Sequence, residues 1–419
     1  MLPRRSSAFL TLGLLALLII FVAGAFLFWN RLAGWLTPHP TATPNTLPTT
    51  APFATRSPFE ATAAAPTNTL SPDLMEVTPS PGPTLAYMFQ NGYPSNINPL
   101  TGITVIDTSI LERRPIAVKV SNFPRYVREW QSGLSLADNV YQYYLEDGLT
   151  RFVAVYYGND ATRVGAVRSA RFFDEHIARM YHAIFVFVGA DERVREYLLK
   201  TDLLYALFTD TEYNCPPLCR DDQVNDYNNF FLDTTKMSAT LAAHQLDNKR
   251  PTLFGMYFNN IPPFSTLTAS RVYTHYSAYD YNYWQYDVAT KKYFRFQETA
   301  DTLNGKDPAY TPHIDNLNRQ QITTDNVVVL FVRHIHNPQS SGQMYVMDLY
   351  NSGQAYIFRD GRVYDARWVR SAYDNLLTFT DPGGNPLPLK TGTTFFQVIG
   401  FSSTVTTSGN DWYFDFIMP

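Results

Sequence analysis

An uninterrupted apolar segment near the amino terminus constrains this chain most. Residues 8–29 contain no charged side chain, and about 22 helical residues at 1.5 Å each are enough to cross a bilayer core of about 30 Å. Arg4 and Arg5 precede the segment and Arg31 alone follows it, so the positive-inside rule predicts a cytoplasmic amino terminus. The alternative is a cleaved signal peptide, because Ala23–Ala25 is typical of a processing site. Both interpretations predict that most of the chain is extracytoplasmic, and we favour the single-pass membrane anchor.

Composition and length limit the remaining classes. A chain of 419 residues exceeds one ordinary domain. The formal net charge is −4 and only 17% of the residues are charged, so there is no basic field of the kind that attracts nucleic acid. We therefore expect a membrane and a cell-wall or envelope ligand as partners, and no nucleic acid.

Changes in composition along the chain divide it into four parts. Residues 37–84 are rich in Thr and Pro without an apolar period, which is typical of a disordered linker. After Pro262 and Pro263 the pattern becomes almost wholly strand-like. The predicted parts are a transmembrane anchor with a short cytoplasmic tail (1–36), the linker (37–84), an amino-terminal domain (85–262) and a β-rich carboxyl-terminal domain (263–419).

Apolar periodicity predicts an α+β fold, with a mixed α/β amino-terminal domain. Alternation indicates strands and a spacing of three to four indicates helices. The Asp147-Gly148 pair is a strong signal for the turn of a hairpin. After residue 262 the apolar runs predict a β-rich meander. The predicted elements of the amino-terminal domain are strands over 115–120, 140–146, 151–157 and 184–188, and helices over 170–183, 191–200 and 238–245.

Several stretches resemble the YerB-like bacterial lipoproteins, which consist of a domain of unknown function and a carboxyl-terminal companion domain. The first domain is indicated by NPLTG (98–102), RRPIAVKVSN (113–122), QSGLSLADNVYQYYLEDGLTRF (131–152) and GAVRSAR (165–171). The companion is indicated by PHID (312–315), TTDNVVVLFV (323–332) and GQAYIFRDGRVYDARW (353–368). The resemblance implies no settled activity.

One departure from that family concerns the membrane anchor. Members typically carry a lipobox cysteine, whereas the cysteines of this chain are Cys215 and Cys219. We therefore expect no lipid attachment, and a membrane helix in its place. In an oxidising extracytoplasmic compartment we expect Cys215 and Cys219 to form a disulfide, with two free thiols as the alternative.

The GAVRSAR stretch contains the candidate ligand site. It is predicted to lead into a helix and to place Arg168 and Arg171 on one helical face. Cations at a helix amino terminus oppose the helix dipole and require an anionic partner. The partner is either a carboxylate of the protein or a carboxylate or phosphate on an envelope ligand. Ser169 is predicted to be a helix N-cap rather than a nucleophile. The candidate acidic partners on preceding segments are Asp138, Glu146 and Asp147.

Catalytic signatures are weak. A glycan hydrolase or lyase could use neighbouring acids, either Glu146-Asp147 or Asp221-Asp222 with Asp226. Spacing alone does not show that two carboxyls face a cleft. No motif indicates a metal, nucleotide or other cofactor. The sequence therefore favours a membrane-anchored extracytoplasmic binding or structural module, with an envelope glycan hydrolase or lyase near Arg168 and Arg171 as the alternative.

An aromatic stretch opens the carboxyl-terminal domain. It could stack on sugar rings, but a half-buried strand that uses the β-propensity of aromatic residues is the favoured interpretation. Its members are Tyr273, Tyr276, Tyr279, Tyr281, Tyr283, Trp284 and Tyr286.

Overall fold

The part of the chain that the structure describes is built mainly of β-strands. The computed structural model describes residues 93–418 apart from 212–213, 225–226 and 338–343. The predicted membrane helix over 8–29 and the predicted linker therefore lie outside the described residues. Within the described ranges the α-helices are short: α3 (Asp174–Met180), α4 (Glu192–Leu199) and α5 (Met237–Ala243). No helix in these ranges has both the length and the apolar character needed to traverse a bilayer.

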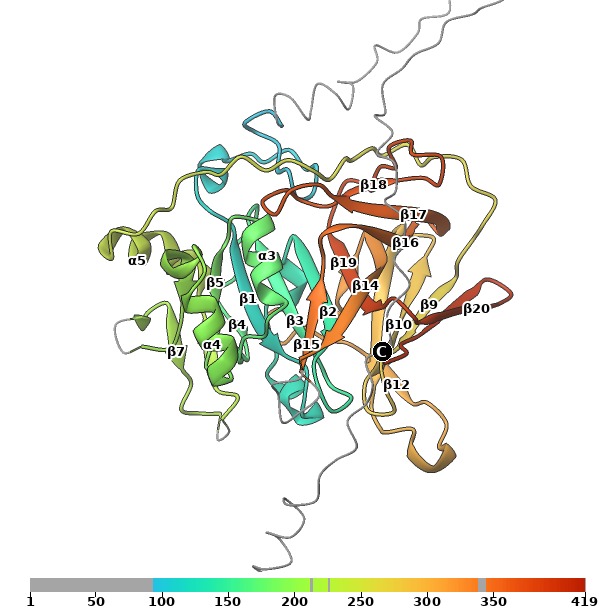
Figure 1. The fold of residues 1–419 in the computed structure, drawn as a ribbon, viewed down its shortest axis with the longest axis horizontal. Helices are drawn as coiled ribbons and strands as arrows, with labels where there is room; N and C mark the ends of the chain where they lie inside the picture. Colours follow the sequence, from blue (N-terminus) through green and yellow to red (C-terminus); the bar gives the residue numbers. More distant parts are fainter. Residues whose placement is uncertain (1–92, 212–213, 225–226, 338–343, 419) are drawn as a thin grey trace, which may run out of the picture. The chain divides into compact units, whose positions relative to one another are not determined.

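An eleven-stranded sheet forms the centre of this unit (Figure 1). Its order is β18-β17-β16-β14-β19-β2-β3-β1-β5-β6, and β15 pairs with β14. Strands from both predicted domains thus share one sheet. Its strands are β1 (Ile116–Ser121), β2 (Asn139–Tyr144), β3 (Thr150–Tyr156), β5 (Ile184–Val186), β6 (Leu207–Phe208), β14 (Asn326–His336), β15 (Tyr345–Asp348), β16 (Asn351–Arg359), β17 (Arg362–Arg370), β18 (Thr378–Thr380) and β19 (Thr394–Gly400).

The hairpin predicted from the Asp-Gly pair is confirmed. Strands β2 and β3 pair antiparallel with Tyr144 opposite Thr150. Asp147 and Gly148 both have positive φ, 55° and 80°, which Gly adopts readily and Asp tolerates. The local turn chemistry was sufficient to identify this pairing.

The predicted carboxyl-terminal meander is only partly correct. Strands β14, β16, β17 and β18 do pair antiparallel in that order. Strand β19, however, lies between β14 and β2 and runs parallel to both. All seven residues of β19 are buried, as expected for a parallel strand covered on both faces. This strand joins the two halves of the sheet.

Each face of the large sheet is covered by a different layer. Alternate residues of β1 show the division, because Ala117 packs in the cluster that contains α3 and α4 side chains, whereas Val118 packs in the cluster that contains the second sheet. The second sheet has the order β12-β11-β10-β9-β21-β20, with β13 paired to β11. Its strands are β9 (Arg271–His275), β10 (Tyr281–Asp287), β11 (Lys292–Glu298), β12 (Tyr310–Pro312), β13 (Thr323–Thr324), β20 (Thr404–Ser408) and β21 (Asp411–Asp415).

A third, small sheet contains the cysteine-bearing segment. Its order is β4-β8-β7, with β4 (Val164–Gly165), β7 (Leu218–Arg220) and β8 (Phe230–Leu232). Single 3₁₀ turns complete the described elements: η1 (Thr108–Leu111), η2 (Arg125–Glu129), η3 (Leu134–Leu136), η4 (Leu204–Ala206), η6 (Thr234–Lys236) and η7 (Leu303–Gly305).

Candidate functional site

Cationic and acidic side chains gather at one end of the helix-covered face of the large sheet. Strands β1 and β3 and the β2–β3 turn supply three of them, and the segment before α3 with the first residue of α3 supplies the others. We call this group the basic cluster. It consists of Lys119, Arg151, Arg168, Arg171, Glu146 and Asp174.

The segment that carries Arg168 is extended rather than helical. The Arg168 amide donates to the carbonyl of Lys119 at 3.0 Å, and the Val188 amide donates to the carbonyl of Arg168 at 3.1 Å. Because these backbone groups are engaged by neighbouring segments, they are not available for helical hydrogen bonds. The predicted helix over 170–183 is therefore wrong in extent, since α3 begins only at Asp174.

Two further predictions about this stretch are corrected by the same geometry. Arg168 and Arg171 both precede α3, so they do not share a helical face. Ser169 is not the N-cap, because Phe173 occupies that position and makes no side-chain capping bond. Ser169 instead contributes its carbonyl, which accepts a hydrogen bond from Arg151 Nη1 at 2.9 Å.

Arg171 pairs with one of the three acidic partners that the sequence suggested. Its Nε donates to Glu146 Oε2 at 3.0 Å, and its Nη2 donates to Glu146 Oε1, so the pair is bidentate. Burial raises the pKa of Glu146, but the hydrogen bond and charge of Arg171, with the charges of Arg151 and Lys119, lower it below its usual value. A carboxylate held ionised in this way is poorly suited to act as a general acid.

A buried triad beneath Arg171 was not anticipated. Lys119 and Asp174 side chains are 0% exposed and lie 3.0 Å apart, Nζ to Oδ1. The Tyr143 hydroxyl contacts both groups, and Asp174 Oδ2 accepts the Arg171 amide at 2.7 Å. Burial lowers the pKa of Lys119 to about 7, although Asp174 opposes this shift. The sequence signal was available, because a lysine in the apolar strand Ile116–Val120 requires a buried partner.

Arg151 and Arg168 complete the cluster. Burial, followed by the charges of Arg171 and Arg168, lowers the pKa of Arg151 to about 9. The Arg168 guanidinium lies 4.6 Å from the ring centroid of Tyr227 and donates to the Tyr227 carbonyl at 3.3 Å. Three guanidinium groups therefore lie near enough to repel one another electrostatically.

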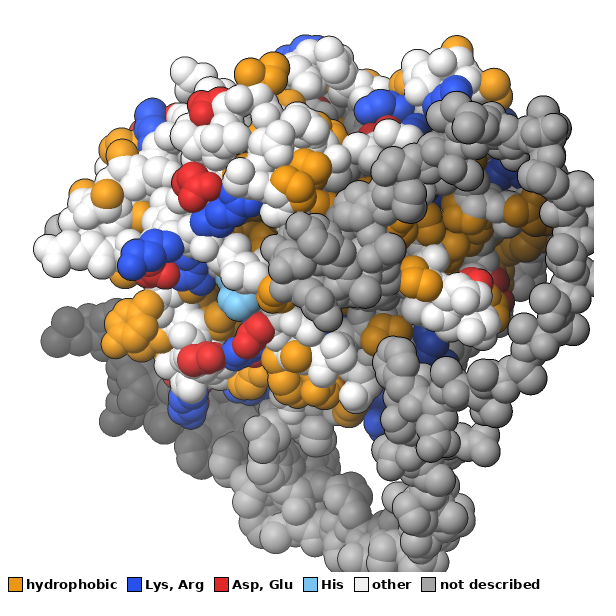
Figure 2. All heavy atoms as spheres, turned by 90° about the horizontal axis from the view of Figure 1, so that it is seen from above, with side chains coloured by type: hydrophobic (Ala, Val, Ile, Leu, Met, Phe, Trp, Pro, Cys, Tyr) orange, Lys and Arg blue, Asp and Glu red, His pale blue; other side chains and the backbone are white. Residues whose placement is uncertain are grey.

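The charge of the basic cluster is unbalanced. By composition it contains four cationic side chains and two carboxylates, and one of the carboxylates is occupied by the buried lysine. On the face seen in Figure 2, acidic and basic side chains are scattered among hydrophobic and other ones. The local excess of guanidinium groups suits an anion that can accept several hydrogen bonds.

Asp138, another candidate, lies apart from these contacts. Its carboxylate accepts the Tyr157 and Gly158 amides, at 2.5 and 2.9 Å, and the Asn98 side-chain amide at 2.8 Å. Burial raises the pKa of Asp138 to about 6 in spite of these bonds. Asp138 thus links the 98–102 loop to the end of β3. The structure does not bring it together with Arg168 or Arg171.

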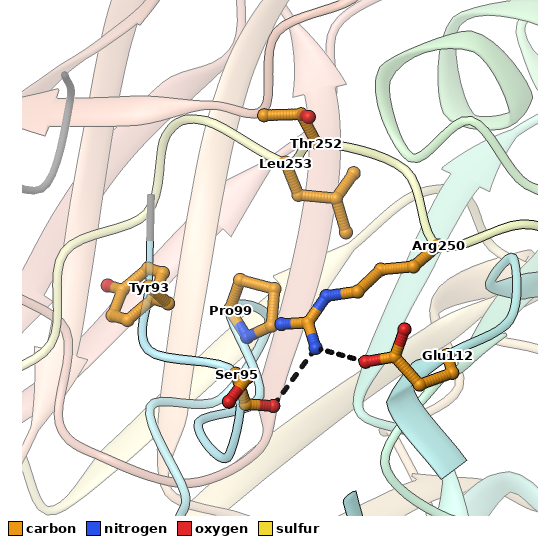
Figure 3. A pocket seen from close by; sticks show the side chains of 7 residues that line it. All are labelled: Tyr93, Ser95, Pro99, Glu112, Arg250, Thr252 and Leu253. Atoms are coloured by element: carbon orange, nitrogen blue, oxygen red, sulfur yellow. Dashed lines mark hydrogen bonds and ion pairs between the residues drawn. The ribbon is translucent and has the colours of Figure 1, made fainter. Parts of the chain in front are cut away.

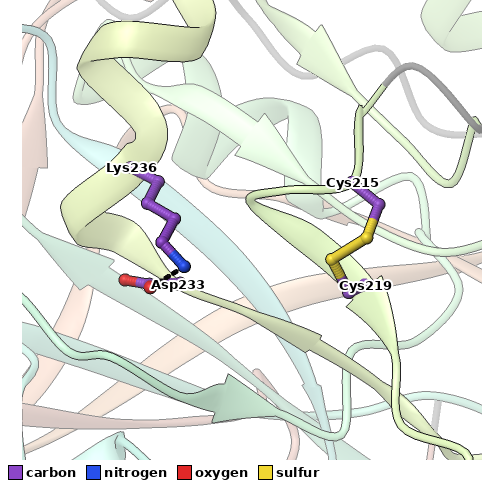
Figure 4. The surroundings of a disulfide bond; sticks show 4 residues. All are labelled: Cys215, Cys219, Asp233 and Lys236. Atoms are coloured by element: carbon purple, nitrogen blue, oxygen red, sulfur yellow. Dashed lines mark ion pairs between the residues drawn. A yellow bond between two sulfur atoms is a disulfide. The ribbon is translucent and has the colours of Figure 1, made fainter.

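The two cysteines are joined in a disulfide at the start of β7 (Figure 4). In the same view Lys236 pairs with Asp233 across 3.0 Å. Of the nearby acids, Asp221 is bound to Arg163 at 2.6 Å, and Asp226 lies outside the described residues. Asp221, Asp222 and Asp233 do line one hollow of about 490 Å³, but Asp221 and Asp233 are paired there with Arg163 and Lys236.

A separate hollow of about 320 Å³ lies where the 93–99 segment meets residues 250–253 (Figure 3). Arg250 reaches across it, and Nη1 donates to the Glu112 carboxylate at 2.9 Å and to the Ser95 carbonyl at 3.0 Å. This arginine is engaged by the protein. The hollow contains one arginine paired with one carboxylate, whereas the basic cluster brings three guanidinium groups together.

Two regions of the chain match a described protein family. Residues 100–247 match "Protein of unknown function (DUF3048) N-terminal domain", and residues 272–396 match the corresponding C-terminal domain. A curated relative, "Putative lipoprotein YerB" of Bacillus subtilis (strain 168), is 25% identical over 312 residues, which are 72% of this chain and 85% of the relative.

A solved structure supports the fold. The crystal structure of the YerB protein from Bacillus subtilis superposes with a TM-score of 0.59 at 22% sequence identity. The match covers 72% of this chain and 96% of that chain. The likeness therefore extends across both halves of the large sheet.

Proposed function

We propose a function for this chain, which belongs to the DUF3048 family of proteins of unknown function, represented by YerB. It is a membrane-anchored extracytoplasmic module that binds an anionic component of the cell envelope at the basic cluster. The observation that carries the proposal is the proximity of three guanidinium groups, those of Arg151, Arg168 and Arg171; burial first, and then the charges of Arg171 and Arg168, lower the pKa of Arg151. A bound carboxylate or phosphate would relieve that repulsion.

The extracytoplasmic location is supported by three independent features. The uncharged segment 8–29 is long enough for a membrane helix. The Cys215–Cys219 disulfide is typical of an oxidising compartment. The relative YerB carries the word lipoprotein in its name, which indicates attachment to a membrane for that protein.

Binding is favoured over hydrolysis by the state of Glu146. Arg171 lowers its pKa and occupies both carboxylate oxygens. A glycosidase acid needs a raised pKa and access to the leaving group. The same bidentate contact instead fixes the Arg171 side chain close to the charge of Arg151.

The test is retention of the full-length chain on purified cell-wall material. Arg151→Ala and Arg168→Ala should each weaken retention by about 10- to 100-fold, since one charged hydrogen bond contributes about 1.5–3 kcal/mol. Retention should also fall with added salt. The matched control is Arg195→Ala, which removes an exposed arginine on α4 and should leave retention unchanged.

Two results would count against anion binding. One is retention no greater than that of a peptide of the Thr- and Pro-rich linker, residues 37–84. The other is equal loss in Arg195→Ala and Arg168→Ala, because that outcome would indicate unspecific attraction by net charge.

A further inference from the structure

A row of aromatic side chains crosses the outer face of the second sheet. In the strand registers Tyr413 of β21 is opposite Tyr273 of β9, Tyr273 is opposite Tyr283 of β10, and Tyr283 is opposite Phe296 of β11. All four are half-buried, whereas the alternate residue Trp284 is fully buried in the core. The aromatic stretch noted in the sequence therefore divides between a core face and a solvent-facing row.

The rings of this row stack on one another. Centroid separations are 4.6 Å for Tyr413–Tyr273, 5.0 Å for Tyr273–Tyr283 and 4.5 Å for Tyr283–Phe296, and the first and last pairs are within 6° of parallel. Tyr310 of β12 stands at 81° to Tyr283 and closes one side. Because stacked rings cover each other's faces, solvent meets apolar ring edges and tyrosine hydroxyl groups.

Polar residues flank the aromatic row on both sides. Arg271 lies two positions before Tyr273 on β9 and pairs with Asp411 across 3.8 Å. His275 lies two positions after it and is 3.8 Å from Asp415, Nδ1 to Oδ1. Side chains two positions apart on a strand share a face, so both pairs lie beside the row. Arg271 and His275 each have an acidic neighbour, so the side chains that flank the row do not form a patch of a single charge.

A hollow of about 400 Å³ opens on the His275 side of the row. Its walls include Tyr273, Tyr413 and Tyr310, and its polar groups include His275 and Asp415. This volume falls in the range of small-molecule sites, about 300–1,000 Å³. The site is thus concave, mostly aromatic and edged with hydrogen-bonding groups.

We propose that this face binds a neutral glycan. A pyranose ring presents C–H groups on its faces and hydroxyl groups around its rim. The sheet offers aromatic rings at the strand spacing of about 4.8 Å, with polar side chains about 6.6 Å away along the strands on either side. A strongly charged ligand would find no complementary field. An extended peptide adds to an unpaired strand edge, but β9 and β10 have strand neighbours on both sides. The proposal is independent of the basic cluster.

The experiment titrates chitotetraose, a neutral soluble oligosaccharide, into the full-length chain in a detergent without a sugar headgroup. Calorimetry should show saturable binding. Tyr273→Ala and Tyr413→Ala should weaken it by about three- to tenfold, the loss expected for one aromatic contact. The matched control is Tyr205→Ala, which removes a tyrosine that is 76% exposed elsewhere on the surface and should change the affinity less than twofold.

Tyr273→Phe and Tyr413→Phe keep the stacked rings and remove only the hydroxyl groups, so they test the site if an alanine variant fails to fold. Weaker binding in these variants supports the proposal. Absence of saturable binding for both chitotetraose and maltotetraose overturns it. Binding that is unchanged in the alanine and phenylalanine variants of Tyr273 and Tyr413 also overturns it. So does binding that is lost in Arg168→Ala, because the glycan would then bind elsewhere.

Discussion

Asp174→Asn should destabilise the protein strongly, because it removes the only carboxylate that contacts Lys119 among the described residues. The substitution preserves side-chain shape, and the amide oxygen can still accept one hydrogen bond. It removes the negative charge that lies 3.0 Å from the fully buried Lys119 ammonium. It also weakens the bond that Asp174 accepts from the Arg171 amide.

The magnitude follows from complete burial of both partners. Both side chains are 0% exposed, so solvent cannot replace the lost partner. Removing one member of a buried ion pair costs about 3–5 kcal/mol. We expect this loss in the free energy of unfolding at pH 6, where Lys119 is mostly protonated in the wild type.

The loss should shrink as the pH rises. The folded-state pKa of Lys119 is about 7, below its unfolded value of about 10.4, so the unfolded chain binds more protons between these values and stability rises with pH there. Without Asp174 the folded-state pKa falls below 7, and this rise begins at lower pH. Between the Lys119 pKa of the variant and that of the wild type, the difference in the free energy of unfolding should therefore shrink by up to about 1.4 kcal/mol per pH unit.

The assay is urea unfolding followed by tryptophan fluorescence at pH 6 and pH 8.5. The control is Asp202→Asn, which removes an acid that is 75% exposed and paired with Arg179, and should cost less than about 1 kcal/mol. The double variant Lys119→Met/Asp174→Leu should recover most of the stability, because the uncompensated charge is gone. A loss below about 1 kcal/mol at pH 6, or one that grows with pH, would refute the reasoning.

Three further outcomes are expected. Arg171→Ala should lower the free energy of unfolding in urea by about 2 kcal/mol, because Glu146 loses its two charge-assisted bonds. Arg171→Lys should recover less than half of that loss, and full recovery would contradict the argument. Burial raises the pKa of Glu298 to about 7 against the opposing charge of Arg128, so its contribution to stability is present below about pH 4.3 and is lost as the pH rises through 7. Between pH 5 and 8 the free energy of unfolding of Glu298→Gln should therefore rise relative to that of the wild type. A constant difference would show that Glu298 does not titrate in this range. Cys215→Ser should lower the free energy of unfolding by about 2 kcal/mol, and the same loss should appear in the wild type under reducing conditions. A further effect of reductant on the variant would show that the loss has a cause other than the disulfide.

Sequence periodicity was enough to predict several local elements of the amino-terminal half. The strands over 115–120 and 184–188 and the helix over 191–200 appear as β1, β5 and α4 with small shifts at their ends. The reason is that strand alternation, helical spacing and turn residues act within a few positions of one another. The Asp-Gly hairpin succeeded on the same ground.

The candidate site was only partly predictable. GAVRSAR was identified because cations beside a predicted helix start require an anion, and Glu146 was among the partners named. The extended conformation of residues 166–170 was missed, because it depends on hydrogen bonds to Lys119 and Val188, which lie on separate segments. Local propensity is overridden when tertiary neighbours occupy the backbone groups.

The sequence by itself determined the apolar segment over 8–29, the low charge and the β-rich character of the carboxyl-terminal half, since these depend on composition and short-range pattern alone. Only the tertiary structure decided that β19 lies between β14 and β2, that Arg171 meets Glu146 while Asp138 lies elsewhere, and that four aromatic residues from four strands form one row. These arrangements depend on strand order and register. Both are fixed by burying side chains on two faces of a sheet at once, and no local stretch of sequence contains that information.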